Sequence, residues 1–213
     1  MVDNISHQTG AQVLFIDDKK NLSRVHLDAI GATTIFFPHW SYIIPNEIYE
    51  NYECVIFHMT DLPYGRGGSP LQNLIVRGIR ETKISALRCI EEVDAGPIFM
   101  KRPLSLQGTA QDIYFRANAI IEDMIVSIIE NKPDPLGQTG EVVLFKRRKE
   151  SDGSLSQLKT LEQVYDHIRM LDAEGYPNAF IETDKLNFKF KNASVKSDYI
   201  IADVIIMRKP DEE

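Results

Sequence analysis

Short apolar runs alternate with helical patterns along the first part of the chain. The runs at 13–16, 33–37 and 54–57 have the length of strands, and the segments at 22–30 and 46–51 have helical spacing. Strands that alternate with helices are typical of a parallel sheet covered by helices. We therefore predict an α/β fold built on a Rossmann-like, mostly parallel sheet.

The alternation continues after the third predicted strand. A helix is expected over 69–79, a strand over 82–90 and the start of another strand at 97–100. From Thr109 to Ile128, apolar residues recur at helical spacing, which predicts a long helix. We interpret this apolar stripe as core and not as a cofactor site.

A linker and a small module are expected after the long helix. Pro133 and Gly137 interrupt the pattern, and a helix at 161–171 is followed by strand-like runs at 187–191 and 200–207. Such a module is too short for a strong core of its own, so we expect it to pack on the larger domain. We divide the chain into a main domain at 1–135, in which the N-terminal strand–helix unit is reduced, a linker at 136–157 and a C-terminal β-containing module at 158–213.

The stretch from His58 onwards combines three features of a binding site. His58 follows a buried strand, a glycine-rich segment at 64–68 comes next, and a helix start follows. Ser69 is expected to cap that helix, with Pro70 at its first position and Gln72 completing a capping box. Ligands of open α/β sheets collect at the carboxyl ends of strands, and helix N-termini favour anions. The alternative is a tight turn beside a histidine that only packs.

The composition is that of an ordinary globular protein, with 213 residues, 43% apolar and 26% charged. The net charge of -7 argues against a nucleic-acid partner, because such binding relies on basic surfaces. We interpret the basic run at 146–149 as a solvated linker. No apolar run approaches the roughly 20 residues of a membrane span. The polar segment at 1–10 is expected to be loosely ordered and is not a signal peptide, so we expect a cytoplasmic protein without a membrane partner.

The two cysteines are expected to be structural. Cys54 and Cys89 lie in apolar, strand-like runs and do not have the spacing of metal ligands. We therefore predict buried thiols in a reducing compartment. No cluster of cysteine or histidine has ligand spacing, so we predict no metal site.

Two sequence motifs resemble those of the formyltransferase family that uses 10-formyltetrahydrofolate. HMTDLP and GRGGSP, within 58–70, are similar to its His-Pro-Ser-Leu-Leu-Pro…Gly-x-x-Pro stretch, and VDAGPI at 93–98 is similar to its Asp-x-Gly-x-Ile/Leu motif. The family includes methionyl-tRNA, glycinamide ribonucleotide and sugar N-formyltransferases. The resemblance implies that His58 and Asp94 are catalytic, with His58 as hydrogen-bond donor and proton relay and Asp94 as the group that orients it.

The resemblance also implies two sets of binding residues. In the family, the segment that matches PHWSYIIP at 38–45 lines the pterin pocket of the folate, although from the residues alone Trp40 could be core and His39 a surface residue. The implied residues for the 10-formyltetrahydrofolate donor are Phe37, His39, Trp40, Ile43, Ile44, Pro45, Glu92 and Val93. The implied residues for the acceptor substrate are Thr60, Tyr64, Arg66, Gly67 and Gly68.

One position departs from the family pattern. Where the family has an asparagine that holds the formyl oxygen, two residues before the histidine, this chain has Ile56. An isoleucine donates no hydrogen bond, and losing such a donor costs about 3 kcal/mol of transition-state stabilisation. Asn73, on the following helix, is a candidate substitute.

The resemblance predicts formyl transfer to the amine of a small acceptor, which we expect to be an amino sugar on a nucleotide carrier because the acidic chain suits tRNA poorly. Two alternatives stay open. One is a hydrolase that deformylates the folate with water as acceptor, and the other is a non-catalytic folate- or nucleotide-binding homologue in which Ile56 has abolished activity. The apolar run at 200–207 could pair across an interface, so a homodimer is a further expectation.

Overall fold

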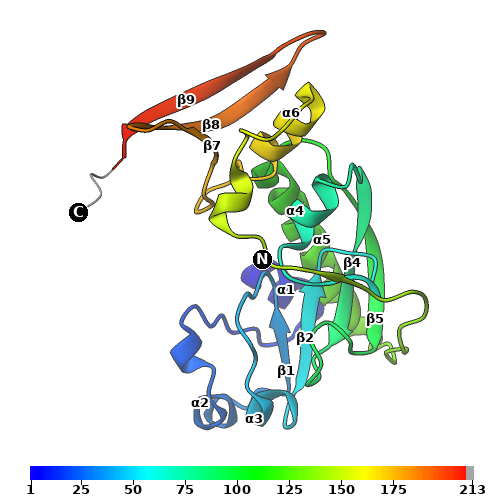
Figure 1. Ribbon diagram of the computed structural model, residues 1–213. Coiled ribbons are helices and arrows are strands. Elements are labelled where there is room, and N and C mark those ends of the chain that lie inside the picture. Colours follow the sequence, from blue (N-terminus) through cyan, green and yellow to red (C-terminus); the bar gives the residue numbers. More distant parts are fainter. Residues whose placement is uncertain (210–213) are drawn as a thin grey trace. The chain divides into compact units, whose positions relative to one another are not determined.

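The computed structural model describes residues 1–209 and contains a four-stranded sheet with the strand order β1-β2-β4-β5 (Figure 1). Strands β1 and β2 pair in parallel, and β2 and β4 pair antiparallel. The predicted α/β fold is confirmed, and the antiparallel β2–β4 pair makes this sheet mixed. The strands are β1 (Thr34–Phe37), β2 (Glu53–His58), β4 (Glu81–Arg88) and β5 (Ile98–Ser105).

Three of the helices begin at side-chain caps. The Thr160 hydroxyl accepts a hydrogen bond from the Gln163 amide at the start of α6, and Ser23 caps α2 in the same way. Thr109 and Asp112 exchange hydrogen bonds at the start of α5 as a capping box. The α-helices are α1 (Val2–Thr9), α2 (Arg24–Ala29), α3 (Asn46–Tyr49), α4 (Pro70–Ile75), α5 (Ala110–Asn131) and α6 (Leu161–Arg169), and the 3₁₀ helices are Lys19–Asn21 and Glu150–Gly153.

The described helices are all too short or too polar to cross a membrane. The apolar stripe predicted for α5 is confirmed as core, because most of its residues are almost fully buried. The buried members of that stripe are Ile113, Ala117, Ile121, Met124, Ile125 and Ile128, whereas Ile120, also predicted to belong to it, is only partly buried.

Two predictions for the N-terminal segment are wrong. The segment at 1–10 is not loosely ordered, since it forms α1 and buries Ile5, whose side chain is 2% exposed. The run at 13–16 is not a strand, and Leu14 and Phe15 stay 53% and 74% exposed. An apolar run forms a stable strand only when it pairs with a sheet and becomes buried there, and this run does not pair with a sheet.

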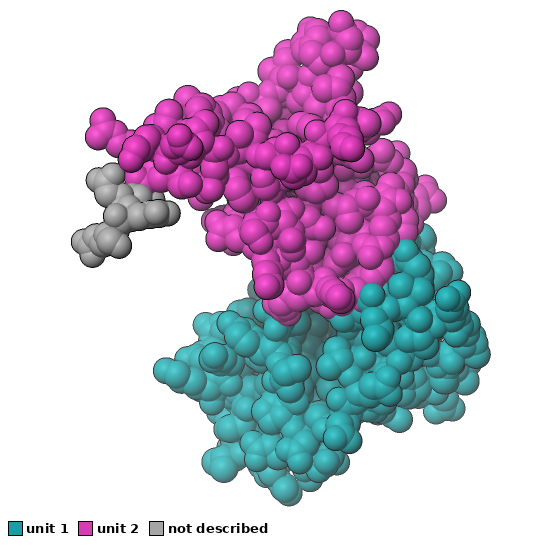
Figure 2. Space-filling view, viewed as in Figure 1, with its two compact units in different colours: residues 1–67, 82–104, 116–144 teal, residues 68–81, 105–115, 145–213 magenta. Residues whose placement is uncertain are grey.

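The structure contains two compact units, shown in teal and magenta in Figure 2. Unit 1 comprises residues 1–67, 82–104 and 116–144, and unit 2 comprises residues 68–81, 105–115 and 145–213. Each unit therefore draws on separate stretches of the chain. The division into domains at 135 and 157 stays a prediction.

The C-terminal module is an antiparallel sheet with the order β7-β8-β9, which confirms the predicted β-containing module. Helix α6 contacts β8, and β8 and β9 form a long ribbon, orange and red in Figure 1. The register of this ribbon shifts between Lys191 and Ser194, as at a β-bulge. These strands are β7 (Ala179–Glu182), β8 (Leu186–Val195) and β9 (Ile200–Arg208), and a separate two-stranded sheet joins β3 (Tyr64–Gly67) to β6 (Val143–Phe145).

Candidate active site

Strand β2 presents His58 at its carboxyl end. The strand is rich in apolar residues, and Cys54 and Val55 are 1% and 0% exposed, so its burial fixes the position of the last residue. The His58 ring is also nearly buried, and its Nε2 atom lies 2.7 Å from the Gly65 carbonyl oxygen on β3. Its Nδ1 atom lies 3.5 Å from Oδ2 of Asp94. The two residues that the motifs single out are therefore neighbours in space.

Asp94 lies in the turn between β4 and β5. Its φ of 54° places it in the left-handed region, which aspartate tolerates better than most residues. Its Oδ2 atom accepts a hydrogen bond of 2.8 Å from the Gly67 amide, so β3 holds the carboxylate that faces His58. The side chains of His58 and Asp94 are 10% and 11% exposed, which leaves each an edge open to a ligand.

This arrangement suits proton transfer. Both ring nitrogens of His58 face oxygen atoms, the Gly65 carbonyl and the Asp94 carboxylate. The Gly65 carbonyl can only accept, so the Nε2 atom carries the proton in this contact, and Nδ1 is the ring atom that faces the carboxylate. A histidine held in this way can act as a hydrogen-bond donor and can pass a proton between two groups.

Arg66 and Gln138 extend this site. The Arg66 guanidinium donates to Oε1 of Gln138 from Nε at 3.1 Å and from Nη2 at 2.9 Å, and its Nη1 lies 2.9 Å from Oε1 of Glu92. Gln138 Nε2 in turn donates to the carbonyl oxygens of Asp94 and Gly96. No local pattern indicated Gln138, because it is a single polar residue in the stretch interpreted as a linker.

The predicted acceptor-binding residues differ in their burial and in their position in the fold. Thr60 is fully buried, with its hydroxyl 3.4 Å from the Gly65 carbonyl oxygen, and Tyr64, Arg66 and Gly67 form β3 beside the histidine. Gly68 lies at a close approach of two backbone segments. A Cβ atom there would lie 2.6 Å from Cα of Arg147, so Gly68 has a packing reason to be glycine.

The predicted donor-binding residues divide into two groups. Phe37 and Ile44 belong to an apolar cluster, and Trp40 packs against it, with its ring centroid 5.5 Å from that of Phe37. His39 pairs through Nε2 with Oδ1 of Asn118 at 2.8 Å. The rest lie at the surface or at a helix start: Ile43, Glu92 and Val93 are exposed, and Pro45 occupies the N-cap position of α3.

A cavity of about 690 Å³ opens beside β1 in unit 1. Phe37, Pro38 and Trp40 line it together with residues of α1 and the end of α5. The Trp40 Nε1 atom is buried without a hydrogen-bond partner among the described residues. Flat apolar walls and one unsatisfied donor fit a flat heteroaromatic ring that carries an acceptor, such as a pterin. His58 and Asp94 are not among the residues that line this cavity.

Ile56 replaces a hydrogen-bond donor with an apolar contact. Its backbone pairs with Phe37 on β1 and with Leu87 on β4, and its side chain packs against the apolar cluster that contains Phe37 and Cys54. An asparagine here would place a carboxamide among those apolar groups. The position is therefore adapted to packing in this chain.

The hypothesis that Asn73 substitutes for the missing donor is wrong on geometry. The Asn73 Nδ2 atom donates to the carbonyl oxygens of Gly68, Ser69 and Lys146, and its Oδ1 atom accepts from Arg77. Its two amide hydrogens are fully engaged in fixing the backbone around α4. No N–H group of Asn73 remains to hold a formyl oxygen.

The predicted capping box at Ser69 is also wrong. Ser69 has a φ of 50° and makes no side-chain cap, and its hydroxyl instead accepts from the Arg148 amide at 3.0 Å. Gln72 points elsewhere and donates to the Met170 carbonyl oxygen. Both side chains bond to distant backbone, which a local pattern does not reveal. Pro70 occupies the first turn as predicted.

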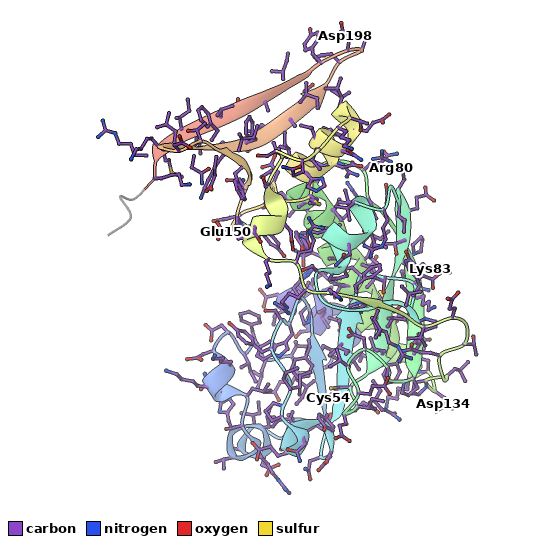
Figure 3. The ribbon with its side chains drawn as sticks, in the orientation of Figure 1. Cys54, Arg80, Lys83, Asp134, Glu150 and Asp198 are labelled. Atoms are coloured by element: carbon purple, nitrogen blue, oxygen red, sulfur yellow. The ribbon has the colours of Figure 1, made fainter. Side chains whose placement is uncertain are left out.

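Cys54 is buried as predicted, whereas the prediction is wrong for Cys89, which is only partly buried. Burial raises the pKa of Cys54 to about 12 and the pKa of Cys89 to about 11. Cys54 lies on β2, where Figure 3 labels it. Both thiols are free, and within residues 1–209 no three His, Cys, Asp or Glu side chains form a group that could hold a metal ion.

The chain and its fold have known relatives. A protein from Clostridium thermocellum described as a methionyl-tRNA formyltransferase is 48% identical, with a TM-score of 0.94 over 98% of this chain and 93% of that one. The methionyl-tRNA formyltransferase of Bacillus thuringiensis is 32% identical over 170 residues, which are 76% of this chain and 54% of that protein. This chain thus spans about half the length of the curated relatives it matches.

Two further matches concern parts of the chain or the fold alone. The family model of the methionyl-tRNA formyltransferase C-terminal domain matches residues 150–207. The structure of HypX from Aquifex aeolicus in complex with tetrahydrofolic acid shares the fold at 19% identity, with a TM-score of 0.67 over 83% of this chain and 32% of that one. The likeness to the Clostridium protein extends over nearly the whole of both chains, so this chain belongs to the formyltransferase family, whose enzymes transfer a one-carbon formyl group.

Proposed function

We propose that this protein transfers a formyl group from 10-formyltetrahydrofolate to an amine, with His58 and Asp94 as its catalytic residues. The observation that supports this proposal is the 3.5 Å approach of His58 Nδ1 to Asp94 Oδ2 at the end of a buried strand. The motifs that contain these residues are 36 positions apart in the chain, and the fold brings them into contact. A purely structural histidine does not require a carboxylate held in place by a backbone amide.

The residues of the chain have separate roles in this proposal. The folate supplies an activated formyl group, and transfer requires a proton to leave the attacking amine and reach the departing nitrogen. In this proposal His58 moves that proton, and its Nε2–H leaves the Gly65 carbonyl oxygen, 2.7 Å away in the structure, to donate to the formyl oxygen as negative charge develops there. Asp94 orients the ring and stabilises its charged form, and the apolar cavity beside Phe37 and Trp40 supplies walls for the pterin.

The acceptor is proposed on the basis of the relatives. The Clostridium protein, at 48% identity, is described as a methionyl-tRNA formyltransferase, so the amine of methionyl-tRNA is the first acceptor to test. The net charge of -7 suits a polyanion such as tRNA poorly, so an amino sugar on a nucleotide carrier, which has fewer charges, is the second acceptor to test. A cytoplasmic location remains a prediction.

The test is a formyl-transfer assay with 10-formyltetrahydrofolate and each acceptor. We expect a formylated product from one acceptor class, and no product from the His58→Ala or Asp94→Ala variants, provided that their circular dichroism matches the natural protein. Full activity in either variant would contradict the proposed roles. Formate release without any amine would instead identify a folate hydrolase.

Calorimetric titration with 5-formyltetrahydrofolate, a stable mimic of the donor, separates the enzyme from the non-catalytic alternative. Binding is expected, and no binding at high concentration would remove the folate from the proposal. If the natural protein binds but does not catalyse, and Ile56→Asn creates activity, the protein is a folate-binding homologue whose activity ended with that substitution.

A further inference from the structure

Gln138 occupies a position between β3 and the turn that carries Asp94. Its Oε1 atom accepts two hydrogen bonds from the Arg66 guanidinium, at 3.1 and 2.9 Å. Its Nε2 atom donates to the carbonyl oxygen of Asp94 at 2.8 Å and to that of Gly96 at 2.9 Å. One carboxamide thus joins a strand to a turn by four hydrogen bonds.

The same strand and the same turn hold the proposed catalytic pair. On β3, Gly65 and Gly67 flank Arg66; the Gly65 carbonyl oxygen lies 2.7 Å from His58 Nε2, and the Gly67 amide donates to Asp94 Oδ2 at 2.8 Å. The contacts close a ring that runs from His58 through β3 to Gln138 and returns through Asp94. Every member of this ring lies in unit 1.

The chemistry of a carboxamide fits this position closely. Arg66 needs an acceptor, the two turn carbonyls need a donor, and an uncharged glutamine offers both. The Arg66 side chain is 12% exposed, whereas the Glu92 side chain that it also contacts is 73% exposed. The Arg66–Glu92 pair is therefore screened by water on one side, and Gln138 is the more sheltered partner.

The backbone at Asp94 has a reason to need such support. Its left-handed conformation, with a φ of 54°, costs a non-glycine residue energy that the surroundings must offset. Gln138 bonds to the carbonyl of this strained residue itself, so it acts on the torsion angles that aim the carboxylate at His58.

We propose that Gln138 is a positioning residue, which holds the turn at 94–96 so that Asp94 stays aligned with His58. This inference rests on the proposed function for its effect on catalysis, and on the contacts alone for its effect on structure. Because a misplacement of about 1 Å can cost on the order of 100-fold in rate, the expected signature is a lower kcat with little change in KM.

The test compares two variants with matched controls. Gln138→Glu keeps the size and the acceptor for Arg66 but turns a carboxylate oxygen towards the two carbonyls, and Gln138→Met removes both functions. The exposed Gln157, in another part of the chain, supplies the controls Gln157→Glu and Gln157→Met. Urea unfolding of each variant separates a lower fraction of folded protein from a lower kcat.

Two readouts decide the proposal. In both Gln138 variants, kcat per folded molecule is expected to fall by about 10- to 100-fold at nearly constant KM, and the controls to match the natural protein. Amide hydrogen exchange at Gly67, which reports its bond to Asp94, is expected to accelerate in the Gln138 variants only.

The second readout does not depend on the reaction. If no variant and no natural protein forms product, the proposed function fails, while faster exchange at Gly67 still supports the positioning role. Unchanged exchange at Gly67 together with an unchanged kcat in a folded Gln138→Met variant would overturn it. A fall in stability with kcat and Gly67 exchange unchanged would equally overturn it, because that result indicates a purely structural glutamine.

Discussion

Gly96 lies directly against the carbonyl of Arg88, at the end of β4. A Cβ atom added to Gly96 would lie 1.8 Å from Arg88 O, which no adjustment of a side chain could relieve because the obstacle is backbone. The Arg88 amide also donates to the Pro97 carbonyl oxygen at 2.9 Å, which draws the turn against the strand. The turn that presents Asp94 therefore has room only for glycine at this position.

Gly96→Ala should shift the turn and displace Asp94 from His58. Forcing a methyl group into a packed site typically costs about 1–3 kcal/mol, and the backbone clash places this variant at the upper end or beyond. We expect a lower free energy of unfolding in urea and a large loss of activity. Gly137→Ala is the control, since an added Cβ there meets nothing within 4 Å. Equal stability of the two variants would contradict the role of Gly96.

Asp94→Asn should remove the charge that faces His58 and leave the turn in place. Asparagine tolerates the left-handed backbone, and its oxygen can still accept from the Gly67 amide. We expect kcat to fall by at least about 100-fold, the usual contribution of acid–base catalysis, with an unchanged thermal midpoint. Asp17→Asn, at an exposed residue, controls for the loss of one charge. Normal kcat in Asp94→Asn would show that the carboxylate is not needed.

Ile56→Asn should destabilise the protein, because it introduces a carboxamide where the structure has an apolar cluster. Burying an unpaired polar group costs about 1–3 kcal/mol in proteins, so the urea midpoint is expected to fall. Ile56→Val, which removes a single methylene group, should cost only about 0.5–1.5 kcal/mol. If the asparagine variant were as stable as the natural protein, a hydrogen-bond partner for it would have to exist beside β2.

The stability of the protein should fall at high pH because of the buried thiol of Cys54 and the partly buried thiol of Cys89. The pKa of Cys54 is raised from 9.0 to about 12, so the folded protein disfavours the thiolate that the unfolded chain readily forms. The contribution of Cys54 is therefore complete below pH 9 and is lost between about pH 9 and 12, by up to about 1.4 kcal/mol per pH unit.

The measurement is urea unfolding at pH 8 and at pH 10.5. The natural protein should lose more stability between these two values than Cys54→Ala, whatever the cost of the small cavity at either pH. Cys89→Ala is the comparison, with a nearly equal change expected, because pH 10.5 lies below the raised pKa values of both Cys54 and Cys89, about 12 and about 11. Identical pH slopes for Cys54→Ala and the natural protein would contradict the prediction.

The homodimer remains a prediction, and the observation that supports it concerns strand β9. Strand β9 is at the edge of its sheet and exposes Val204, Ile205 and Ile206 along its length. We expect light scattering to show association that increases with concentration and that Ile206→Lys weakens. A natural protein that remains monomeric at high concentration would remove the idea.

Local sequence patterns predicted the elements that local interactions decide. The apolar run before His58 has the length of a buried strand, and the apolar residues of α5 recur at helical spacing, so both elements could be recognised from the sequence. The run at 13–16 has the same pattern as a strand but is not in a sheet, and the Ser69 hydroxyl bonds to Arg148 instead of its own helix. In both cases a distant contact, or the lack of one, determined the outcome.

His58 and Asp94 could be predicted as the catalytic pair because each lies in a recognisable motif. The contacts of Gln138, which hold the turn of Asp94, could not be predicted. Gln138 gains its role only from contacts with Arg66 and Asp94, which lie 72 and 44 positions away in the chain. A glutamine between glycine and threonine in a polar stretch has no periodicity and no cap to indicate such contacts. Only the folded chain shows them.

The long sequence separation within this ring has a consequence for how the protein is made. Contacts between residues that are far apart in the sequence form late, because the chain must first lose the entropy of closing a large loop. During synthesis, His58 and Asp94 leave the ribosome well before Gln138, so a nascent or truncated chain that ends at 135 has both motifs but not the clamp that aligns them. On the proposed function, such a chain would hold Asp94 less firmly against His58 than a chain that includes Gln138.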